Sequence, residues 1–599
     1  MELNAIQKQP LIKNDRFSSQ ERVWRGVFFI SLAVASLIFL ISRLFVLQIV
    51  KGSYYETVSD ENRIRAEVLK AYRGVIKDRE GRILAQNSPS FNIKINKNVS
   101  NYSEIIKKLS IFIDTSSPVS VGEFTIFGNV NRDTAIKIEA GFFGSFAVAV
   151  ETAPQRDYLY PEELAHLLGY VSFISSEADD RVGVIGVEKF YDIYLRGSHG
   201  SLLYEYDAKG SILREIARKE PVNGKDLTIS IDLDLQLKSY EALKKAVEET
   251  GATGGVVVAQ NPKNGEILAL VSLPSFNPNL FSRGISSADY NKIVSDPLHP
   301  MFNRALLGQY PPGSVFKIVT ASAVLEEGVV TADTKVLAPG AINVGSFVYR
   351  DWNPAGHGEV NIIRALAESA DTFFYKVVGG YSDFANNLGP EKLASWAKKF
   401  GLGSETGIGF DDEEKGIIPD PLWKKEVKDE PWYIGDSYIT AIGQGDVLTT
   451  PIQVNQMTSV IANGGYLISP KIVRGQTPSD KSDNSDKSDI SDESNTIISK
   501  EVFETVKQGL KEACEAGGTG YPFFDFATKH SGIKPACKTG TSEFGQKNSK
   551  GEYQTHAWFV VFAPVDNAQI VLTVFLEGGG GGADIAAPVA REILDFWFD

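Results

Sequence analysis

The sequence predicts an α+β protein with a single N-terminal transmembrane helix, an elongated mixed domain, and a C-terminal domain in which helices flank an antiparallel sheet. Three observations lead to this prediction. A long uncharged apolar run lies near the N-terminus, short strand-like runs follow it, and strand-like pairs stand at both ends of the remaining chain with helical patterns between them. With 599 residues, the chain is long enough for several domains.

The apolar run is long enough to cross a bilayer. Residues 26–42 carry no charge, and after Arg43, whose long side chain can reach an interface, the apolar pattern continues to Val50. Basic residues outnumber acidic ones before the run, which favours a cytoplasmic N-terminus and an external remainder. We therefore expect a cytoplasmic tail at 1–25 and a transmembrane helix at 26–50. A cleaved signal peptide is the alternative, but the run is long and lacks an A-x-A cleavage site.

Residues 51–225 are expected to form a pedestal or dimerisation-like domain. Short β-like runs at 91–96 and 146–152 are separated by polar turns, and a helical pattern begins at Pro161, since proline suits the first turn of a helix. No catalytic constellation is visible in this region. We therefore interpret it as a stalk or docking module.

Residues 226–599 are expected to form a second, larger domain. An amphipathic helix ends at Gly251, a helix-stop signal, and a hairpin follows at 254–272. Near the other end, a second hairpin is predicted at 556–577 and a terminal helix at 584–597. Strands at both ends with helices between them predict one sheet that the C-terminus completes.

Composition excludes other classes of protein. The net charge of −14 argues against a broad nucleic-acid-binding surface. Two cysteines cannot form a disulfide scaffold; Cys514 and Cys537 can pair outside the cytoplasm or remain free thiols, and their spacing does not decide between these states. Residues 479–495 are a low-complexity run of Ser, Asp and Lys, which we expect to be a disordered loop.

Ser314-Val315-Phe316-Lys317 is the first pattern that can carry chemistry. On a helix, positions i and i+3 share a face, so Lys317 Nζ can reach Ser314 Oγ. A serine hydroxyl needs a base to take its proton, and a desolvated lysine can be that base. N–H groups at the start of a helix also stabilise an oxyanion. Alone, S-x-x-K is weak because it recurs by chance in a chain of this length.

Two further patterns support a catalytic role for Ser314 and Lys317. Ser369-Ala370-Asp371 reads S-x-D, and Lys538-Thr539-Gly540-Thr541 reads K-T-G-T. The order S-x-x-K, S-x-[N/D], K-[T/S]-G is typical of penicillin-binding proteins and β-lactamases. In an edge strand beside a cleft, Lys and Thr present donors to a carboxylate, and the glycine lets a substrate backbone lie close.

The chain resembles the class B penicillin-binding proteins over nearly its whole length, and most closely the elongation-type group, penicillin-binding protein 2. Besides the three patterns, the resemblance rests on RGVIKDREGRILAQN at 73–87, GVIGVEKFYDIYLRG at 183–197, RALLGQYPPGSVFK at 304–317, ITAIGQGDVLTTPIQV at 439–454 and the glycine run at 578–582. The division-type group usually carries S-x-N and lacks the glycine run, so the elongation type is favoured.

This resemblance implies a penicillin-binding transpeptidase domain that acts as a serine-type peptidoglycan D,D-transpeptidase. Ser314 would attack the amide between the terminal D-alanines of a stem peptide, and an amine of a neighbouring stem would resolve the acyl-enzyme into a cross-link during cell elongation. β-Lactams mimic the D-Ala-D-Ala end and would acylate the same serine. Lys317 would be the base, Ser369 a proton relay, and Lys538 a nearby charge that keeps Lys317 neutral.

The resemblance also implies the substrate contacts. Asp371, Thr539, Gly540 and Thr541 would bind the substrate, with the threonine hydroxyls on its terminal carboxylate. The backbone N–H groups of Ser314 and Thr541 would form the oxyanion hole.

Some relatives bind zinc beside this site through a cysteine inside S-x-D, together with Asp and His residues. That position is Ala370 here, so we expect no metal and no other cofactor, and we interpret Asp351, Trp352 and His357 as structural. Gln444 is expected, with the glycine after it, to line the cleft.

The expected partners are peptidoglycan stem peptides, β-lactams, a membrane glycan polymerase and other elongation-complex proteins, and the membrane through one helix, but no nucleic acid. The expected location is the bacterial cytoplasmic (inner) membrane, with a single pass, the N-terminus in the cytoplasm and the catalytic domain outside. Three alternatives stay open: a D,D-carboxypeptidase that transfers the acyl group to water, a β-lactam-hydrolysing or sensing relative, and a scaffold that activates a membrane glycosyltransferase.

Overall fold

The computed structural model describes residues 19–55, 63–115, 119–121, 123–143, 145, 147–173, 181–206, 212–409, 412–474, 496–547, 551 and 553–599. They belong to two compact units, one made of Met1–Ala71 with Ser198–Val222 and one made of Tyr72–Gly197 with Asn223–Asp599. The loop expected at 479–495 and most of the tail expected at 1–25 lie outside the described residues.

The first unit contains the apolar helix that the sequence predicts. Helix α1 covers Ser19–Phe45 and continues as a π-helical turn, η1, at Val46–Val50. The stretch Val23–Val50 is long and apolar enough to cross a membrane, and its side chains are exposed rather than packed inside the protein. The unit also holds an antiparallel sheet in the order β1-β9-β10, with bounds β1 Ile64–Leu69, β9 Gly200–Tyr206 and β10 Ile212–Lys219.

The N-terminal part of the second unit is built on a six-stranded sheet. Its strand order is β11-β2-β3-β5-β4, and β6 pairs with β3. The β-like run predicted at 91–96 is confirmed as part of β3, whose Ile93 and Ile95 are buried under helices α3 and α4. The bounds are β2 Ile76–Lys77, β3 Ile83–Asn96, α3 Tyr102–Leu109, β4 Val119–Val121, β5 Phe124–Val130, α4 Arg132–Gly141, β6 Val148–Tyr158 and β11 Leu227–Thr228.

The helix predicted to start at Pro161 is much shorter than its pattern indicates. Only α5, Ala165–Leu168, is helical, and the residues before it form turns. Gly169 ends the helix with φ +72°, and a Cβ there would lie 1.9 Å from the carbonyl oxygen of Ile185. The Ile185 backbone thus packs closely on Gly169, where the helix ends. The neighbouring elements are β7 Val171–Phe173, β8 Arg181–Gly183, α6 Gly186–Phe190 and α7 Asp192–Arg196.

A buried ion network stabilises this part of the fold. The fully buried carboxylate of Glu188 accepts from Nε of Arg73 and from Nε of Arg156, both at 2.6 Å, and these arginines lower its pKa against the opposing effect of burial. Gly74 leaves no space for a side chain, since a Cβ would lie 1.9 Å from the carbonyl oxygen of Lys225. These contacts are structural.

The rest of the second unit is a helical domain around a five-stranded antiparallel sheet. The strand order β13-β12-β20-β19-β18 confirms both predicted hairpins and the prediction that the C-terminus completes the sheet. The bounds are α8 Leu233–Thr250, β12 Gly254–Gln260, β13 Ile267–Leu273, α9 Pro278–Ser282, α10 Ser287–Val294, η2 Gly313–Phe316, α11 Lys317–Glu326, β14 Val336–Ala338, β15 Ala341–Val344, β16 Phe347–Arg350, β17 Gly358–Val360, α12 Ile362–Ala367, α13 Asp371–Gly379, α14 Pro390–Lys399, α15 Pro421–Lys428, α16 Ile434–Ala441, α17 Pro451–Ala462, α18 Lys500–Ala513, η5 Tyr521–Phe523, α19 Phe526–Lys529, β18 Ala536–Phe544, β19 Gln554–Ala563, β20 Ile570–Glu577, η6 Gly582–Ala586 and α20 Ala587–Phe598.

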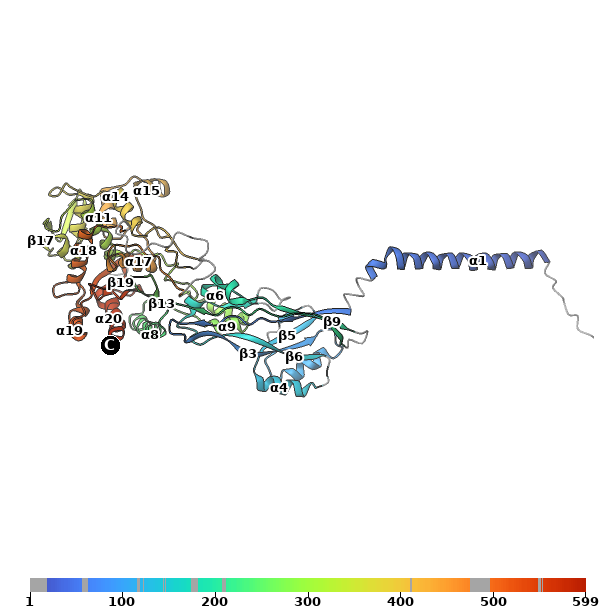
Figure 1. The fold of residues 1–599 in the computed structure, drawn as a ribbon. Coiled ribbons are helices and arrows are strands. Elements are labelled where there is room, and N and C mark those ends of the chain that lie inside the picture. Colours follow the sequence, from blue (N-terminus) through green and yellow to red (C-terminus); the bar gives the residue numbers. More distant parts are fainter. Residues whose placement is uncertain are drawn as a thin grey trace, which may run out of the picture. The chain divides into compact units, whose positions relative to one another are not determined.

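Both faces of this sheet are covered by helices (Figure 1). Val256 and Val258 of β12 enter the core that contains residues of α11 and α17, whereas Val257 and Ala259 enter the core that contains residues of α8 and α20. This explains why the strands read as continuous apolar runs rather than as an alternation. Strand β18 is an edge strand, so one of its sides is free of strand pairing.

Candidate active site

The three predicted patterns come together around the start of α11. Gly313 and Ser314 open the 3-10 helix η2, and Lys317 is the first residue of α11. Gly313 has φ +57°, donates its N–H to the carbonyl oxygen of Gly443 at 2.8 Å, and would bring a Cβ within 2.8 Å of the carbonyl oxygen of Thr541. This turn therefore holds Ser314 against the K-T-G-T strand. The first N–H groups of a helix have no partners within the helix, so those near Ser314 can bind an oxygen atom.

Lys317 is fully buried and uses all three hydrogens of its ammonium group. Nζ donates to the carbonyl oxygen of Ser369 at 2.9 Å, to Ser369 Oγ at 3.0 Å, and to Asp371 Oδ1 in a very short contact. Among the described residues, no hydrogen bond joins Nζ to Ser314 Oγ. The direct link expected from the i, i+3 spacing is therefore not made here, because three acceptors of the S-x-D segment take the hydrogens.

Ser369 adopts a backbone conformation that is rare for a residue with a side chain. It lies between α12 and α13 with φ +56°, and its carbonyl oxygen accepts from Lys317 Nζ and, at 3.1 Å, from Trp352 Nε1. A non-glycine residue in this region is strained by about 1–3 kcal/mol, which surrounding contacts must offset. The hydroxyl is thereby turned toward Lys317, as a proton relay requires.

Lys538 interacts electrostatically with Lys317. It is fully buried, and its Nζ donates to the carbonyl oxygen of Thr539 at 3.0 Å. Burial, and then repulsion from Lys317, lower the pKa of Lys538 well below its ordinary value. Lys317 also contacts a counter-ion, Asp371. The effect of Lys538 on the charge of Lys317 stays a prediction.

The side chains of the K-T-G-T strand alternate between two sides. Thr539 Oγ1 donates to Thr519 Oγ1 at 2.8 Å, and the exposed Thr541 accepts at Oγ1 from the N–H of Gly582 at 3.2 Å. A Cβ on Gly540 would lie 2.9 Å from Cβ of Trp558 and 3.0 Å from a methyl group of Val315. The lack of a side chain at Gly540 therefore also allows the strand to pack closely on η2.

Asp351 and Glu368 form hydrogen bonds with the two ring nitrogens of His357. His357 Nε2 lies 3.0 Å from Asp351 Oδ1, and Nδ1 lies 2.8 Å from Glu368 Oε2. The carboxylates thus occupy opposite sides of the ring and cannot join His357 around one tetrahedral zinc ion. No group of three or more metal-ligating side chains is found among the described residues. Asp351 also accepts from the N–H of Thr372 at 3.0 Å, which fixes the start of α13.

The structure resolves the state of the cysteines. Cys514, at the end of α18, and Cys537, immediately before Lys538, form a disulfide.

Sequence reasoning missed three residues around the patterns: Gly443, Thr519 and Gly582. Gly443 faces η2, and a Cβ there would lie 2.5 Å from the carbonyl oxygen of Gly313. None of the three belongs to a catalytic residue type in a catalytic spacing, so only their contacts identify them.

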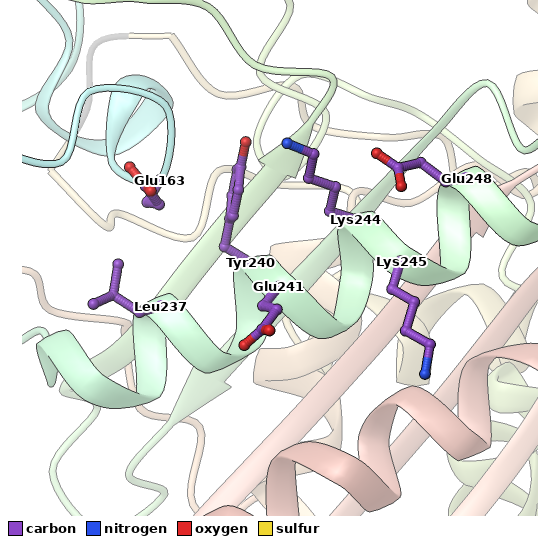
Figure 2. A pocket seen from close by; sticks show the side chains of 7 residues that line it. All are labelled: Glu163, Leu237, Tyr240, Glu241, Lys244, Lys245 and Glu248. Carbon is purple, nitrogen blue, oxygen red and sulfur yellow. The ribbon is translucent and has the colours of Figure 1, made fainter.

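A shallow groove lies elsewhere on the second unit. It has a volume of about 450 Å³ and follows α8 (Figure 2). Tyr240 and Lys244 rise from the helix toward the groove, while Lys245 points away from them. The groove contains none of the residues of the three patterns, and its acidic and basic side chains are mixed, so it has no single charge that would select a ligand. Its lining residues are Glu163, Leu237, Tyr240, Glu241, Lys244, Lys245 and Glu248.

Comparison with known proteins identifies the family. Residues 255–595 match the penicillin binding protein transpeptidase domain, which covers more than half of the chain, and residues 68–229 match the penicillin-binding protein dimerisation domain. The chain belongs to the penicillin-binding protein transpeptidase family. The Ser-x-x-Lys turn, the S-x-D segment and the K-T-G-T strand all lie inside the matched transpeptidase domain of this penicillin-binding protein.

The similarity to characterised penicillin-binding proteins extends over nearly the full chain. The chain is 32% identical to the peptidoglycan D,D-transpeptidase MrdA of Acinetobacter baumannii, over 96% of this chain and 88% of that protein. It resembles PBP2 in a complex with MreC from Helicobacter pylori, with 27% identity, a TM-score of 0.74 and coverage of 89% and 99% of the two chains. A chain of a peptidoglycan synthase complex is 28% identical, with a TM-score of 0.69 and coverage of 96% and 98%.

Proposed function

We propose that this chain is a peptidoglycan D,D-transpeptidase that cross-links stem peptides through a serine acyl-enzyme during cell elongation. The observation that carries the proposal is the convergence of three distant segments: Lys317 contacts Ser369 and Asp371, while Gly313 contacts Thr541 beside the nucleophile. The family match and the full-length similarity to MrdA support the substrate class.

Acylation of Ser314 is the first step of the proposed reaction. Ser314 Oγ attacks the carbonyl carbon of the D-Ala-D-Ala amide, and Lys317, in its neutral form, takes the hydroxyl proton. The backbone N–H groups of Ser314 and Thr541 stabilise the oxyanion. When the tetrahedral intermediate collapses, Ser369 passes a proton to the departing amine, so that D-alanine leaves and an ester remains on Ser314.

Deacylation repeats these steps with a different nucleophile. An amine of a neighbouring stem attacks the ester carbonyl, gives up a proton through Ser369 and Lys317, and forms the cross-linking amide as Ser314 regains its hydrogen. A β-lactam enters the same first step, but ring opening leaves no departing amine, so the acyl-enzyme persists. Transfer to water instead of an amine would make the chain a carboxypeptidase.

Substrate binding is assigned to the K-T-G-T strand and to Asp371. Thr539 and Thr541 hold the terminal carboxylate, and the buried Lys538 adds positive potential when it is protonated. Asp371 holds Lys317 in position through a direct contact. Gly540 lets the substrate backbone lie close to the strand and also allows the strand to pack closely on η2.

The proposed location is the inner membrane, crossed once by the apolar helix, with the N-terminus in the cytoplasm and the catalytic part outside. The proposed domains are a tail at 1–25, an anchor at 26–50, a pedestal at 51–225 and a transpeptidase domain at 226–599. The PBP2–MreC complex and the peptidoglycan synthase complex support partners of the same kind here, an elongation-complex protein and a membrane glycan polymerase.

Labelling with a fluorescent penicillin tests the proposal. The full-length chain in detergent should become covalently labelled, and Ser314→Ala should remove the label. Ser322→Ala is a matched control, because Ser322 lies in α11 and its hydroxyl donates only to the carbonyl oxygen of Ile318 at 2.8 Å. An unlabelled native chain would contradict the proposal. Supplying a stem-peptide donor with and without an acceptor amine separates cross-linking from release of a hydrolysed product.

A further inference from the structure

A fourth segment reaches the site besides the three patterns. The chain from Cys514 to Gly520 connects α18 to η5, and its Thr519 contacts two of the patterns at once. Thr519 N–H donates to the carbonyl oxygen of Ala367 at 3.1 Å, two residues before Ser369. Thr519 Oγ1 accepts from the hydroxyl of Thr539 at 2.8 Å. Thr519 therefore bridges the end of α12 and the K-T-G-T strand.

This segment is held tightly in place. The disulfide joins Cys514 to Cys537, next to Lys538, and Gly520 N–H donates to the carbonyl oxygen of Ala513 at 2.8 Å. A Cβ on Gly520 would lie 2.6 Å from the Cys537 sulfur, so the turn packs directly on the disulfide. Because the disulfide and the Gly520 contacts fix the segment at both of its ends, the Thr519 hydroxyl has a defined position.

The helix that leads into the segment is fixed as well. Helix α18 packs closely on α12, since a Cβ on Gly509 would lie 2.9 Å from Cβ of Leu366. Arg364 of α12 forms an ion pair with Glu512 of α18 at 3.4 Å. The end of α12, the segment and strand β18 therefore keep a common geometry at Thr519.

The chemistry of the hydroxyl pair matches a carboxylate. Thr539 donates its hydroxyl hydrogen to Thr519, and among the described residues no acceptor takes the hydroxyl hydrogen of Thr519. Thr539 is 8% exposed, and Thr519 is partly exposed. Two hydroxyl oxygens 2.8 Å apart can both turn toward one anionic group, and hydrogen bonds to a charged acceptor are stronger than the neutral bond that they replace.

We propose that Thr519 is a further substrate-binding residue, which donates a second hydroxyl hydrogen bond to the terminal carboxylate held by Thr539. The proposal rests on the proposed function and adds a contact from outside the three patterns. If Thr519 binds the carboxylate, loss of its hydroxyl weakens binding only of ligands that carry this charge. A residue that only supports the fold would affect charged and uncharged ligands alike.

A comparison of two ligands tests this coupling. The full-length chain in detergent is acylated by a penicillin with a free carboxylate and by the methyl ester of the same penicillin, and the second-order rate constant is measured for each. Thr519→Val, which keeps the shape and removes the hydroxyl, should lower the constant for the acid about tenfold and that for the ester less than threefold. Thr519→Ser should restore the acid to near the native value.

Thr505→Val is the matched control, since Thr505 lies in α18 and its hydroxyl donates to the carbonyl oxygen of Glu501 at 2.9 Å, within the same helix. It should change neither constant. Equal losses for the acid and the ester in Thr519→Val, or no loss for either, would overturn the binding role. The native chain is labelled in both of these outcomes, so they differ from a failure of the proposed function, in which the native chain is not labelled at all.

Discussion

The indole nitrogen of Trp352 donates to the carbonyl oxygens of Ser369 and Glu368, both at 3.1 Å, although the Trp352 residue is 58% exposed. A tryptophan this exposed contributes little to a core, so its position is best explained by these bonds. Ser369 has φ +56° and needs contacts that keep this conformation. Trp352 thus acts on the S-x-D segment from the rim of the site.

Replacement of Trp352 tests this effect. Trp352→Phe keeps an aromatic ring but removes the N–H donor, so Ser369 loses one of its two carbonyl donors. We expect acylation by penicillin to slow by about fivefold, which corresponds to a neutral hydrogen bond of roughly 1 kcal/mol. The unfolding temperature should change little because the ring is exposed. An unchanged acylation rate would show that the other donor, Lys317, suffices.

The packing of Gly582 on the K-T-G-T strand leads to a second prediction. A Cβ at this position would lie 2.3 Å from the carbonyl oxygens of Gly540 and Trp558, so Gly582→Ala must move η6 away from the strand. Thr541 then loses the N–H donor that orients its hydroxyl. We expect acylation to fall about tenfold and the free energy of unfolding to fall by about 1–3 kcal/mol.

Gly581→Ala is the control for this experiment. Its Cβ would meet only Asp584, at 2.9 Å from the end of that flexible side chain. Acylation should then stay near the native rate. Equal losses of acylation rate in the two variants would mean that any change in the glycine run disturbs the site. The Gly582–Thr541 hydrogen bond would then not be needed for acylation.

The sequence predicts the main elements of this site for identifiable reasons. The hairpins that contain β12 and β19 have long apolar runs with turn residues between them. Ser314 and Lys317 are three residues apart at the start of a helix, which places both on one face. What the spacing does not predict is the direction of the Lys317 side chain. That direction depends on Asp371 and on the left-handed conformation of Ser369, which tertiary contacts determine.

Other parts were missed because no local pattern carries them. Thr519 lies in a glycine-rich turn without catalytic residue types, and only the folded chain brings it to Thr539. The helix expected from Pro161 begins only at Ala165, because the residues before it form turns that its helical pattern does not predict. The pairing of Cys514 with Cys537 could not be chosen over free thiols, because 23 residues of separation set no geometry.

The disulfide predicts a change in stability. Cross-linking residues 23 apart restricts the unfolded chain, so reduction should lower the free energy of unfolding by about 3 kcal/mol in the chain-entropy description. Urea unfolding of the full-length chain with and without a thiol reductant measures this difference. The variant in which both cysteines are serine is the control, since the chain has no other cysteine and the reductant should then have no effect. Equal stability of the oxidised and reduced chains would contradict the prediction.

His556 predicts a loss of stability in mild acid. Burial lowers the pKa of His556 to about 4, below the ordinary value of about 6.5, and its Nδ1 accepts from the N–H of Gly578 at 3.1 Å. Between these values the unfolded chain binds a proton that the folded chain does not. This stabilisation is therefore complete above about pH 6.5 and is lost as the pH falls toward 4.

The effect is measured by comparing the native chain with His556→Asn. From pH 7.5 to pH 5, the free energy of unfolding of the native chain should fall by about 2 kcal/mol more than that of the variant. His166, whose pKa burial also lowers to about 4, contributes to both proteins and cancels in the comparison. Parallel pH curves would mean that His556 is accessible to protons in the folded state.

Mapping the acylated residue shows whether Ser314 is the nucleophile. The full-length chain is incubated with a penicillin, digested and mapped by mass spectrometry. We expect one adduct per chain, on the peptide that contains Ser314, and no adduct in Ser314→Ala. A native chain that stays unmodified, or an adduct on any other residue, would contradict the claim that the three segments converge to make Ser314 the nucleophile.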